Sequence, residues 1–469
     1  MLVNMIGDLT PIVVSEILKT KLVGDAYAKT PLYNVATDSR EFGENGLFIA
    51  IKGERADGHL YVNKAAENGA VCAIVEYIPK GAPDICYIVV EDTVKALGAL
   101  AAAYKYAVHP LTVAVTGSVG KTTTKEFVYS VLSEKYKTLK TEANHNNHIG
   151  MPMTLLGLDE GHKAAVLEMG MSAFGEISYL SKIGMPDIAI ITNIGSSHIE
   201  NLGSREGIRN AKLEVSDGMK EDGILILDGD EPLLAGIDSA YYVSMTGRRA
   251  YANVSNIISG ENGMAFDITI GGECTESIVI PVLGEHNVKD AAYAFVVGKL
   301  LGMGEFEIRR GLMNYQSVGL RQKVTKVGDI TLIEDCYNAS PESMRAALSL
   351  LNKMASRHGV KSSAVLGEMR ELGSYCESGH RGVGSFLAYQ KIDRLFTFGE
   401  LARMIADEAI REGMDPKNVF CTDALDDYEA LAEKIVNNIT PSEMILFKAS
   451  RAVALENAVE FVKKKISER

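Results

Sequence analysis

Apolar runs and polar breaks divide this chain into strands and helices that alternate for most of its length. Short apolar runs bounded by glycine, proline or charge predict buried strands. In the first stretch these runs stand at Val71–Val75 and Cys86–Glu91, and the alanine-rich segment Val94–Tyr106 predicts a helix. His109-Pro110 then interrupts the pattern, and we place a domain boundary there.

The alternation of strand and helix continues after this break. In the middle stretch we expect strands at Leu111–Val115, Ala164–Met169 and Asp187–Asn193, and helices from Lys121 and over Arg205–Met219. From about Ser317 onward the expected strands are Thr331–Asp335, Ser363–Leu366, Arg394–Phe398, Val419–Thr422 and Met444–Lys448. Pro341 stands where a helix should begin, with Met344, Leu348 and Leu351 on one face. Such alternation predicts mostly parallel sheets covered by helices on both faces.

The length of the chain predicts how many domains it forms. At roughly 150 residues per domain, 469 residues suggest about three domains, which we place at 1–108, 109–316 and 317–469. The third has Rossmann-like alternation, but no GxGxxG follows a strand, so a dinucleotide cofactor is not implied.

Charge and cysteine content exclude several classes of protein. The net charge of −13 argues against general nucleic-acid binding, which requires neutralisation of phosphates. None of the six cysteines falls in a CxxC pair, so we expect reduced thiols rather than a zinc or redox site. No apolar run reaches the roughly 18–20 residues that span a bilayer, and residues 1–20 lack the basic start and cleavage site of a signal peptide. We therefore expect a cytoplasmic protein.

The segment Thr112–Thr124, TVAVTGSVGKTTT, carries the clearest chemical signal. A strand runs into a glycine turn, and Lys and Thr then open a helix, so backbone N–H groups and the helix dipole can hold phosphate. Lys121 can reach the β- and γ-phosphates of ATP, and the Thr122 hydroxyl can bind Mg²⁺. The general pattern GxxxxGK[ST] would place glycine where this chain has Val115, so the loop is the shorter variant found in some ATP-binding families.

Other polar residues follow predicted strands of the middle stretch. Glu168 ends the strand that contains AAVLE, where a carboxylate suits Mg²⁺, although it could simply end the strand. His198 follows DIAIITN and could bind a second metal or phosphate, but a lone histidine is more often structural. Lys212, in a predicted helix, is on its own more typical of a solvated surface.

Further polar residues could contact a substrate. Asn144, Asn146 and Asn147 form an Asn-rich stretch that could hydrogen-bond a polar ligand or form an ordinary turn. In the third stretch, polar and cationic residues that follow strands or begin helices predict a cleft facing the central domain; these residues are Arg321, Asp335, Tyr337, Asn338, Arg381 and Arg451.

Nine segments in order give the chain a family resemblance. They are TDSR at 37–40, TGSVGKTTTKE at 116–126, NHNNHIGMPMTLL at 144–156, EMGMSAFGEI at 168–177, TNIGSSHIENLGSREGIRNAK at 192–212, GEHNVKDAA at 284–292, DCYNASPESMRAAL at 335–348, LGEMRELG at 366–373 and KASR at 448–451. Together they resemble the Mur ligases of peptidoglycan synthesis over essentially the whole chain. The DCYNASPESM segment resembles the branch that adds D-alanyl-D-alanine to UDP-N-acetylmuramoyl-tripeptide. The resemblance implies roles in cell-wall biogenesis, cell shape and cell division.

The resemblance also implies an architecture and a set of site residues. It implies an α/β fold with a small N-terminal UDP-substrate-binding domain, a central P-loop ATP-binding domain and a C-terminal Rossmann-like ligase domain. ATP would contact Thr116, Gly117, Ser118, Val119, Gly120, Lys121, Thr122, Thr123, Asn287, Arg321 and Asp335. Metal ligands would be Thr122 and Glu168 for one Mg²⁺, and His198 with a carbamylated Lys212 for a second. The catalytic residues would be Lys121, Lys212 and His198. Substrate contacts would come from Ser39, Arg40, Asn144, Asn146, Asn147, Tyr337, Asn338 and Arg451.

The implied reaction activates a carboxylate as an acyl phosphate, which the amine of D-alanyl-D-alanine then attacks. We expect a monomer that binds small molecules and neither nucleic acid nor membrane. Asp290, His148 and Ala449 depart from the family pattern, since asparagine, an acidic residue and glycine are usual there. Three alternatives remain open: another Mur-type or folylpolyglutamate-type amide ligase, a P-loop ATPase without ligase activity, and a non-enzymatic nucleotide-binding scaffold.

Overall fold

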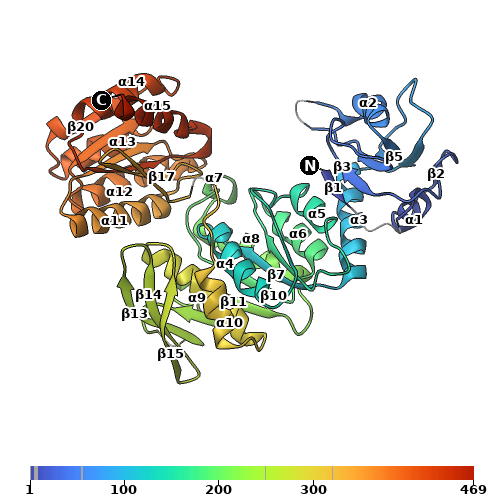
Figure 1. Cartoon of the computed structure of the whole chain (residues 1–469), viewed down its shortest axis with the longest axis horizontal. Coiled ribbons are helices and arrows are strands. Elements are labelled where there is room, and N and C mark those ends of the chain that lie inside the picture. Colours follow the sequence, from blue (N-terminus) through green and yellow to red (C-terminus); the bar gives the residue numbers. More distant parts are fainter. Residues whose placement is uncertain (1, 5–8, 54–55, 249, 320, 469) are drawn as a thin grey trace.

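The computed structural model describes residues 2–4, 9–53, 56–248, 250–319 and 321–468. Within these ranges the strands form three sheets, of six, nine and six strands, that follow one another along the chain. The central domain lies between the other two (Figure 1). The predicted three-domain α/β architecture is therefore confirmed. Of the segment 1–20, residues 1 and 5–8 lie outside the described ranges.

The N-terminal sheet is mixed. Its order is β1-β3-β4-β5-β6-β2, with β3 to β6 parallel and both edge strands antiparallel. Its elements are β1 (Leu2–Asn4), α1 (Pro11–Ile17), β2 (Leu22–Val23), β3 (Asn34–Ala36), β4 (Gly46–Ile49), α2 (Val62–Glu67), β5 (Ala70–Val75), β6 (Cys86–Val89) and α3 (Thr93–Val108). The strand predicted at Val71–Val75 is confirmed, and the strand predicted at Cys86–Glu91 ends two residues earlier.

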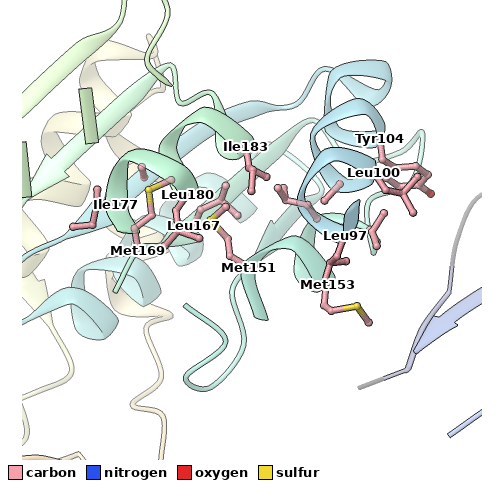
Figure 2. Close-up of a cluster of buried hydrophobic side chains, with 14 of the residues drawn as sticks. Leu97, Leu100, Tyr104, Met151, Met153, Leu167, Met169, Ile177, Leu180 and Ile183 are labelled. Carbon is pink, nitrogen blue, oxygen red and sulfur yellow. The ribbon is translucent and has the colours of Figure 1, made fainter. Parts of the chain in front are cut away.

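Helix α3 joins the N-terminal domain to the central one. It begins where the Asp92 carboxylate accepts hydrogen bonds from two backbone N–H groups, and it ends at His109 in the left-handed conformation. Its buried side chains Leu97, Leu100 and Tyr104 pack with apolar residues of α5 and α6 in the central domain (Figure 2). The same cluster contains residues of the N-terminal sheet, so one apolar core runs through both domains.

The central sheet has the order β15-β14-β13-β12-β11-β10-β7-β9-β8. It is parallel from β8 to β13, and β13 to β15 continue it as an antiparallel meander. Its elements are β7 (Leu111–Thr116), α4 (Lys121–Ser133), β8 (Thr138–Lys140), α5 (Gly150–Leu155), β9 (Ala164–Glu168), α6 (Glu176–Gly184), β10 (Ile188–Ile191), α7 (Ile199–Leu202), α8 (Arg205–Leu213), β11 (Ile224–Asp228), β12 (Tyr241–Ser244), β13 (Ala252–Ser259), β14 (Met264–Ile270), β15 (Glu273–Ile280), α9 (Glu285–Leu300) and α10 (Glu305–Met313).

The central sheet separates two apolar cores. Alternation along β7 sends Val113 and Val115 into a core with α4, α9 and α10, and Ala114 into the core shared with α3, α5, α6 and α8. The predicted helix Arg205–Met219 is α8 followed by a 3₁₀ turn over Glu214–Gly218.

The C-terminal sheet has the order β16-β17-β21-β18-β19-β20, and only β16 is antiparallel to its neighbour among the described strands. Its elements are β16 (Lys323–Val327), β17 (Ile330–Asp335), α11 (Pro341–His358), β18 (Ser362–Gly367), α12 (Cys376–Tyr389), β19 (Arg394–Phe398), α13 (Arg403–Arg411), β20 (Val419–Thr422), α14 (Tyr428–Asn438), β21 (Met444–Lys448) and α15 (Glu456–Ser467). Helices α11 to α13 pack on one face, and α14 and α15 pack on the other. The predicted strands and the helix start at Pro341 are confirmed.

The boundaries predicted after residues 108 and 316 fall between α3 and β7 and between α10 and β16, and they stay a prediction. In the part of the chain that the structure describes, no helix combines the length and apolar character needed to cross a membrane.

Candidate active site

A cleft of about 1260 Å³ lies where the central and C-terminal domains face each other. Of the predicted site residues, those that line it are Ser118, Val119, Gly120, Lys121, Thr122, Thr123, Asn144, Asn146, Asn147, Glu168, His198, Asn287, Arg321, Asp335, Tyr337, Asn338 and Arg451. Thr116, Gly117, Lys212, Ser39 and Arg40 are not among the lining residues. The carboxyl ends of parallel strands in two sheets thus converge on one space.

The phosphate loop is held in shape by the neighbouring strand. Gly117 has φ 149°, and a Cβ there would lie 1.9 Å from Thr192 Oγ1, so only glycine fits. Thr192 Oγ1 donates to the Val119 carbonyl at 2.6 Å, and Val119 N donates to Asn193 Oδ1 at 3.0 Å. Thr192 and Asn193 were not among the predicted site residues, although they directly follow β10, the strand beside β7, and that position could have indicated them.

Lys121 folds back over this loop. Its Nζ donates to the Gly117 carbonyl at 2.7 Å. Burial lowers the pKa of Lys121, and the nearby Glu168 carboxylate opposes that shift. Lys121 and the loop N–H groups at the start of α4 therefore form a cationic end to the cleft that suits phosphate.

Glu168 lies at the centre of a hydrogen-bond network. It ends β9, which pairs in parallel with β7, so its carboxylate reaches the start of α4. Thr122 Oγ1 donates to Glu168 Oε2 and Asn146 Nδ2 donates to Glu168 Oε1, both at 2.9 Å. The backbone N–H of Glu168 donates to Thr141 Oγ1 at 3.0 Å.

The donor set around Glu168 fits Mg²⁺. Thr122 and Glu168 present oxygen ligands of the kind that this hard cation prefers. Among the described residues, no group of three or more His, Cys, Asp or Glu side chains could hold a metal by itself. An ion here would depend on phosphate oxygens and water for its remaining ligands, which is usual for Mg²⁺ bound with a nucleotide.

His198 and Lys212 occupy different surroundings. His198 has φ 62° at the start of α7, and its Nδ1 lies 2.6 Å from Glu371 Oε2 of the C-terminal domain. Hydrogen bonding to this imidazole lowers the pKa of Glu371. Lys212 is 2% exposed within α8. Burial, with a smaller effect from the cationic Lys121, holds the pKa of Lys212 well below its usual value.

The three asparagines of the Asn-rich stretch have different roles. Asn146 holds Glu168, as described above. Asn147 Oδ1 accepts from the backbone N–H groups of Ile149 and Gly150, at 3.1 and 2.8 Å, and so supports the start of α5. Asn144 is exposed in the cleft.

A buried lysine organises the C-terminal side of the cleft. Lys448 Nζ donates to Asp335 Oδ2 at 2.6 Å and to the Asn338 carbonyl at 2.9 Å. The Arg321 guanidinium lies 4.1 Å from the centre of the Tyr337 ring. All of these residues except Lys448 were predicted from the sequence. Lys448 could have been found from its place in KASR at the end of a buried strand.

The structure shows the partners of three further predicted residues, Asn287, Arg451 and Arg381. Asn287 Nδ2 donates to the Leu283 carbonyl at 2.6 Å and to Gln322 Oε1 at 2.9 Å. Arg451 pairs with Glu456 at the edge of the cleft. Arg381 was placed at a helix start in the cleft, which is wrong: it lies inside α12 and pairs with Glu377.

The N-terminal residues form a separate group. Arg40 Nη2 lies 2.6 Å from Asp38 Oδ2, and hydrogen bonds from Arg40 hold the pKa of Asp38 well below its usual range. The Ser39 carbonyl accepts from Asn68 Nδ2 at 2.7 Å.

The three departures from the family pattern differ in position. Asp290 is buried in α9, and its Oδ1 accepts from Thr124 Oγ1 at 2.9 Å. Burial raises the pKa of Asp290 to about 8. His148 is exposed, and Ala449 is buried with its Cβ beside Gly367.

Family models match three parts of the chain. The Mur ligase family catalytic domain matches residues 31–105, the Mur ligase middle domain matches 115–298, and the Mur ligase glutamate ligase domain matches 321–451.

Individual relatives match over nearly the whole length. UDP-N-acetylmuramoyl-tripeptide–D-alanyl-D-alanine ligase of Bacillus subtilis is 41% identical over 450 residues, which cover 95% of this chain and 96% of the relative. A crystal structure of MurF from Acinetobacter baumannii superposes with a TM-score of 0.89 at 31% identity, covering 98% of this chain and 100% of the other. MurF from Thermotoga maritima in complex with ADP has a TM-score of 0.81 at 29% identity, covering 93% and 98%.

Proposed function

This chain belongs to the Mur ligase family, and from that membership we propose that it joins D-alanyl-D-alanine to UDP-N-acetylmuramoyl-tripeptide with ATP. The observation that carries the proposal is the 41% identity, over 95% of the chain, with a relative named for that reaction. The solved relative bound to ADP supports ATP as the energy source. The reaction places the enzyme in peptidoglycan precursor synthesis.

The proposed reaction has two steps. A terminal carboxylate oxygen of the tripeptide attacks the γ-phosphorus of ATP, the bond from that phosphorus to the bridging oxygen breaks, and ADP leaves. The amine of D-alanyl-D-alanine then attacks the acyl carbon, loses a proton, and expels phosphate. A carboxylate resists attack by nucleophiles because it is anionic, so phosphorylation supplies the leaving group.

We assign the triphosphate to the loop Thr116–Thr123, with the Lys121 ammonium beside the transferred phosphoryl group. Lys121 already points along this loop, and offsetting the negative charge of phosphate and carboxylate is the main task at such a site. Asn287, Arg321 and Asp335 would hold the adenine and ribose end, since all three line the same cleft.

Magnesium would be held by Thr122 and Glu168, whose oxygens lie 2.9 Å apart. When bound, it would neutralise charge on the β- and γ-phosphates. A second ion would involve His198 and Lys212. The lowered pKa of Lys212 favours a neutral amine, and a neutral amine can add CO₂ and release a proton to form an anionic carbamate ligand.

The remaining contacts are divided among the domains. Ser39 and Arg40 of the N-terminal domain would bind the UDP end, and Asn144, Asn146 and Asn147 would line the path of the peptide. Tyr337, Asn338 and Arg451 would receive the acceptor dipeptide. We also propose domain boundaries after residues 108 and 316. The proposed protein is a monomer, and it is located in the cytoplasm, where ATP and UDP-linked precursors are found.

Phosphate release tests the function. The purified chain is supplied with Mg²⁺, ATP and UDP-N-acetylmuramoyl-tripeptide, with or without D-alanyl-D-alanine. We expect release to depend on both substrates and the amide product to appear in equal amount. Release that ignores the tripeptide would instead indicate an ATPase without ligase activity, and a preference for a different amino acceptor would indicate another amide ligase.

A further inference from the structure

A fully buried lysine lies beside the proposed magnesium ligand and has no part in the function described so far. Lys125 is 0% exposed and stands one turn after Lys121 and Thr122 on α4. Its Nζ donates to the Thr141 carbonyl at 2.6 Å and lies 3.0 Å from Glu126 Oε1. Glu168 Oε2 lies 3.9 Å from the same Nζ.

Lys125 belongs to a network of four charges. Glu126 lies between two cations, because its Oε2 also accepts from Lys140 Nζ at 2.7 Å. Glu126 and Glu168 are 5% and 2% exposed. Two ammonium groups thus face two carboxylates, and the network is neutral overall, as burial of charge requires.

The network connects the segments that build the magnesium site. Lys125 lies on the helix that carries Thr122. Lys125 also contacts the Thr141 carbonyl. The Thr141 hydroxyl accepts a hydrogen bond from the Glu168 backbone N–H. Thr141 begins the segment that carries Asn146, which donates to the Glu168 carboxylate. One ammonium therefore fixes α4, the end of β9 and the start of the Asn-rich stretch relative to one another.

The distances show that the neighbours of Glu168 act on its carboxylate in two different ways. Thr122 and Asn146 make direct hydrogen bonds to its carboxylate, whereas Lys125 stays 3.9 Å away because Thr141 and Glu126 hold it. At that distance the ammonium stabilises the carboxylate charge but leaves room at the oxygen for a cation. Mg²⁺ demands near-ideal octahedral geometry, so a carboxylate that binds it needs fixed surroundings.

We propose that Lys125 is a positioning residue that fixes Glu168 for magnesium and is kept from occupying the metal's place by Glu126. The inference rests on the proposed function, because that function assigns Mg²⁺ to Glu168. It also makes Glu126 the residue that sets how strongly Lys125 competes with the metal.

Three variants separate this role from simple stabilisation of the fold. Lys125→Gln keeps a donor for the Thr141 carbonyl but removes the charge. Glu126→Gln leaves Lys125 with Glu168 as its remaining carboxylate. Lys140→Met is the matched control, since it removes a cation of the same network that does not contact Glu168.

The measurement is the affinity of a fluorescent ADP analogue, in EDTA and across a range of Mg²⁺ concentrations, with the thermal midpoint of each variant. We expect all variants to match the unmodified protein in EDTA. With magnesium, Lys125→Gln should need about tenfold more metal for half of the gain in affinity, in line with other residues that orient metal ligands. Glu126→Gln should need several-fold more, and Lys140→Met should stay within about twofold of the unmodified protein.

Each outcome decides the inference. A folded Lys125→Gln with unchanged magnesium dependence overturns it, as does an equal shift in Lys140→Met. If Lys125→Gln does not fold, Glu126→Gln decides: a raised magnesium requirement supports the inference and an unchanged one overturns it. If the unmodified protein itself gains no affinity from magnesium, the proposed metal site fails as well, which distinguishes that failure from one confined to Lys125.

Discussion

The two regions to which we assign metal ions differ in how far the protein has already built them. Around Glu168, both carboxylate oxygens accept hydrogen bonds, and a buried ammonium balances the charge. Around Lys212, the buried amine has no hydrogen bond or ion pair within the described ranges, and, besides burial itself, the charge that shifts its pKa is the ammonium of Lys121. His198 contacts a carboxylate of a different domain.

The two proposed metal sites therefore differ in what each still needs before it can bind its ion. The Glu168 region is formed by the central domain alone and needs only its ion and nucleotide. Under the proposal, the second region would require a chemical change at Lys212, and His198 would exchange Glu371 for a metal. We infer that the first region is preorganised, whereas the second responds to CO₂ and to the position of the C-terminal domain.

The largest effect is expected from Lys121→Ala, which removes the ammonium that we assign to the phosphate loop. Ligation should fall by about 10³-fold or more, because the negative charge on the phosphoryl oxygens would lose this cation. Product formation is measured by chromatography, and a thermal melt confirms folding. Turnover close to normal would contradict our interpretation of the loop.

Lys212→Ala should slow ligation by about 10²-fold, because a metal ligand is lost while the rest of the site stays. Short carboxylic acids such as acetate should restore part of the rate, since they can place a carboxylate where the carbamate would be. The rate is measured with and without added acid, with Lys182→Ala as a control on an exposed lysine of α6. Full activity without rescue would remove the carbamate from the proposal.

The variants Asn146→Ala and Asn147→Ala compare two neighbouring residues, one that holds the proposed metal ligand and one that only stabilises the fold. Asn146 holds Glu168, so its loss should raise the magnesium requirement by about tenfold. Asn147 Oδ1 accepts two backbone hydrogen bonds before α5, so its loss should lower the free energy of unfolding by about 1 kcal/mol and leave the magnesium requirement nearly unchanged. Magnesium titration and urea unfolding measure the two effects, and equal behaviour of both variants would contradict these assignments.

The smallest effect on activity is expected from Asp290→Asn, which tests a buried acid that has no cation in direct contact. Burial raises the pKa of Asp290 in the folded state to about 8, from about 4 when unfolded. Between these values the folded state binds more protons, so the stability that Asp290 contributes is full below pH 4 and lost as pH rises through 8. The free energy of unfolding of the variant should match that of the parent near pH 4 and exceed it by on the order of 5 kcal/mol near pH 8. Urea unfolding at several pH values measures this difference, and parallel curves would exclude a raised pKa.

The parallel strands could be predicted because each is a continuous buried apolar run, as β9 and β21 are. The antiparallel strands β13 to β15 were missed because their exposed and buried residues alternate irregularly across two bulges. Local pattern carries little information about such strands, whose stability comes from their neighbours.

The site residues could be predicted where a polar or charged side chain lies at or just after the carboxyl end of a buried strand. Glu168 and Asp335 are the last residues of β9 and β17, and Lys121 begins α4 after the glycine turn that follows β7. Lys125 and Lys448 were missed because they contact residues distant in the sequence, Thr141 and Asp335, and a linear pattern does not contain such contacts. The contact of His198 with Glu371 depends on the placement of two domains and was equally inaccessible.

Helix α3 also determines where the chain can be cut. It ends the first predicted domain, yet its apolar side packs against α5 and α6 of the second (Figure 2). A fragment that begins at Leu111 would expose that surface to water, whereas one that begins at Thr93 would keep it covered. The C-terminal domain is attached differently, by polar contacts such as Lys353 with Glu285 and Ser196 with Glu342. We therefore expect the chain to behave as two pieces when fragments are expressed separately, with the better cut after α10.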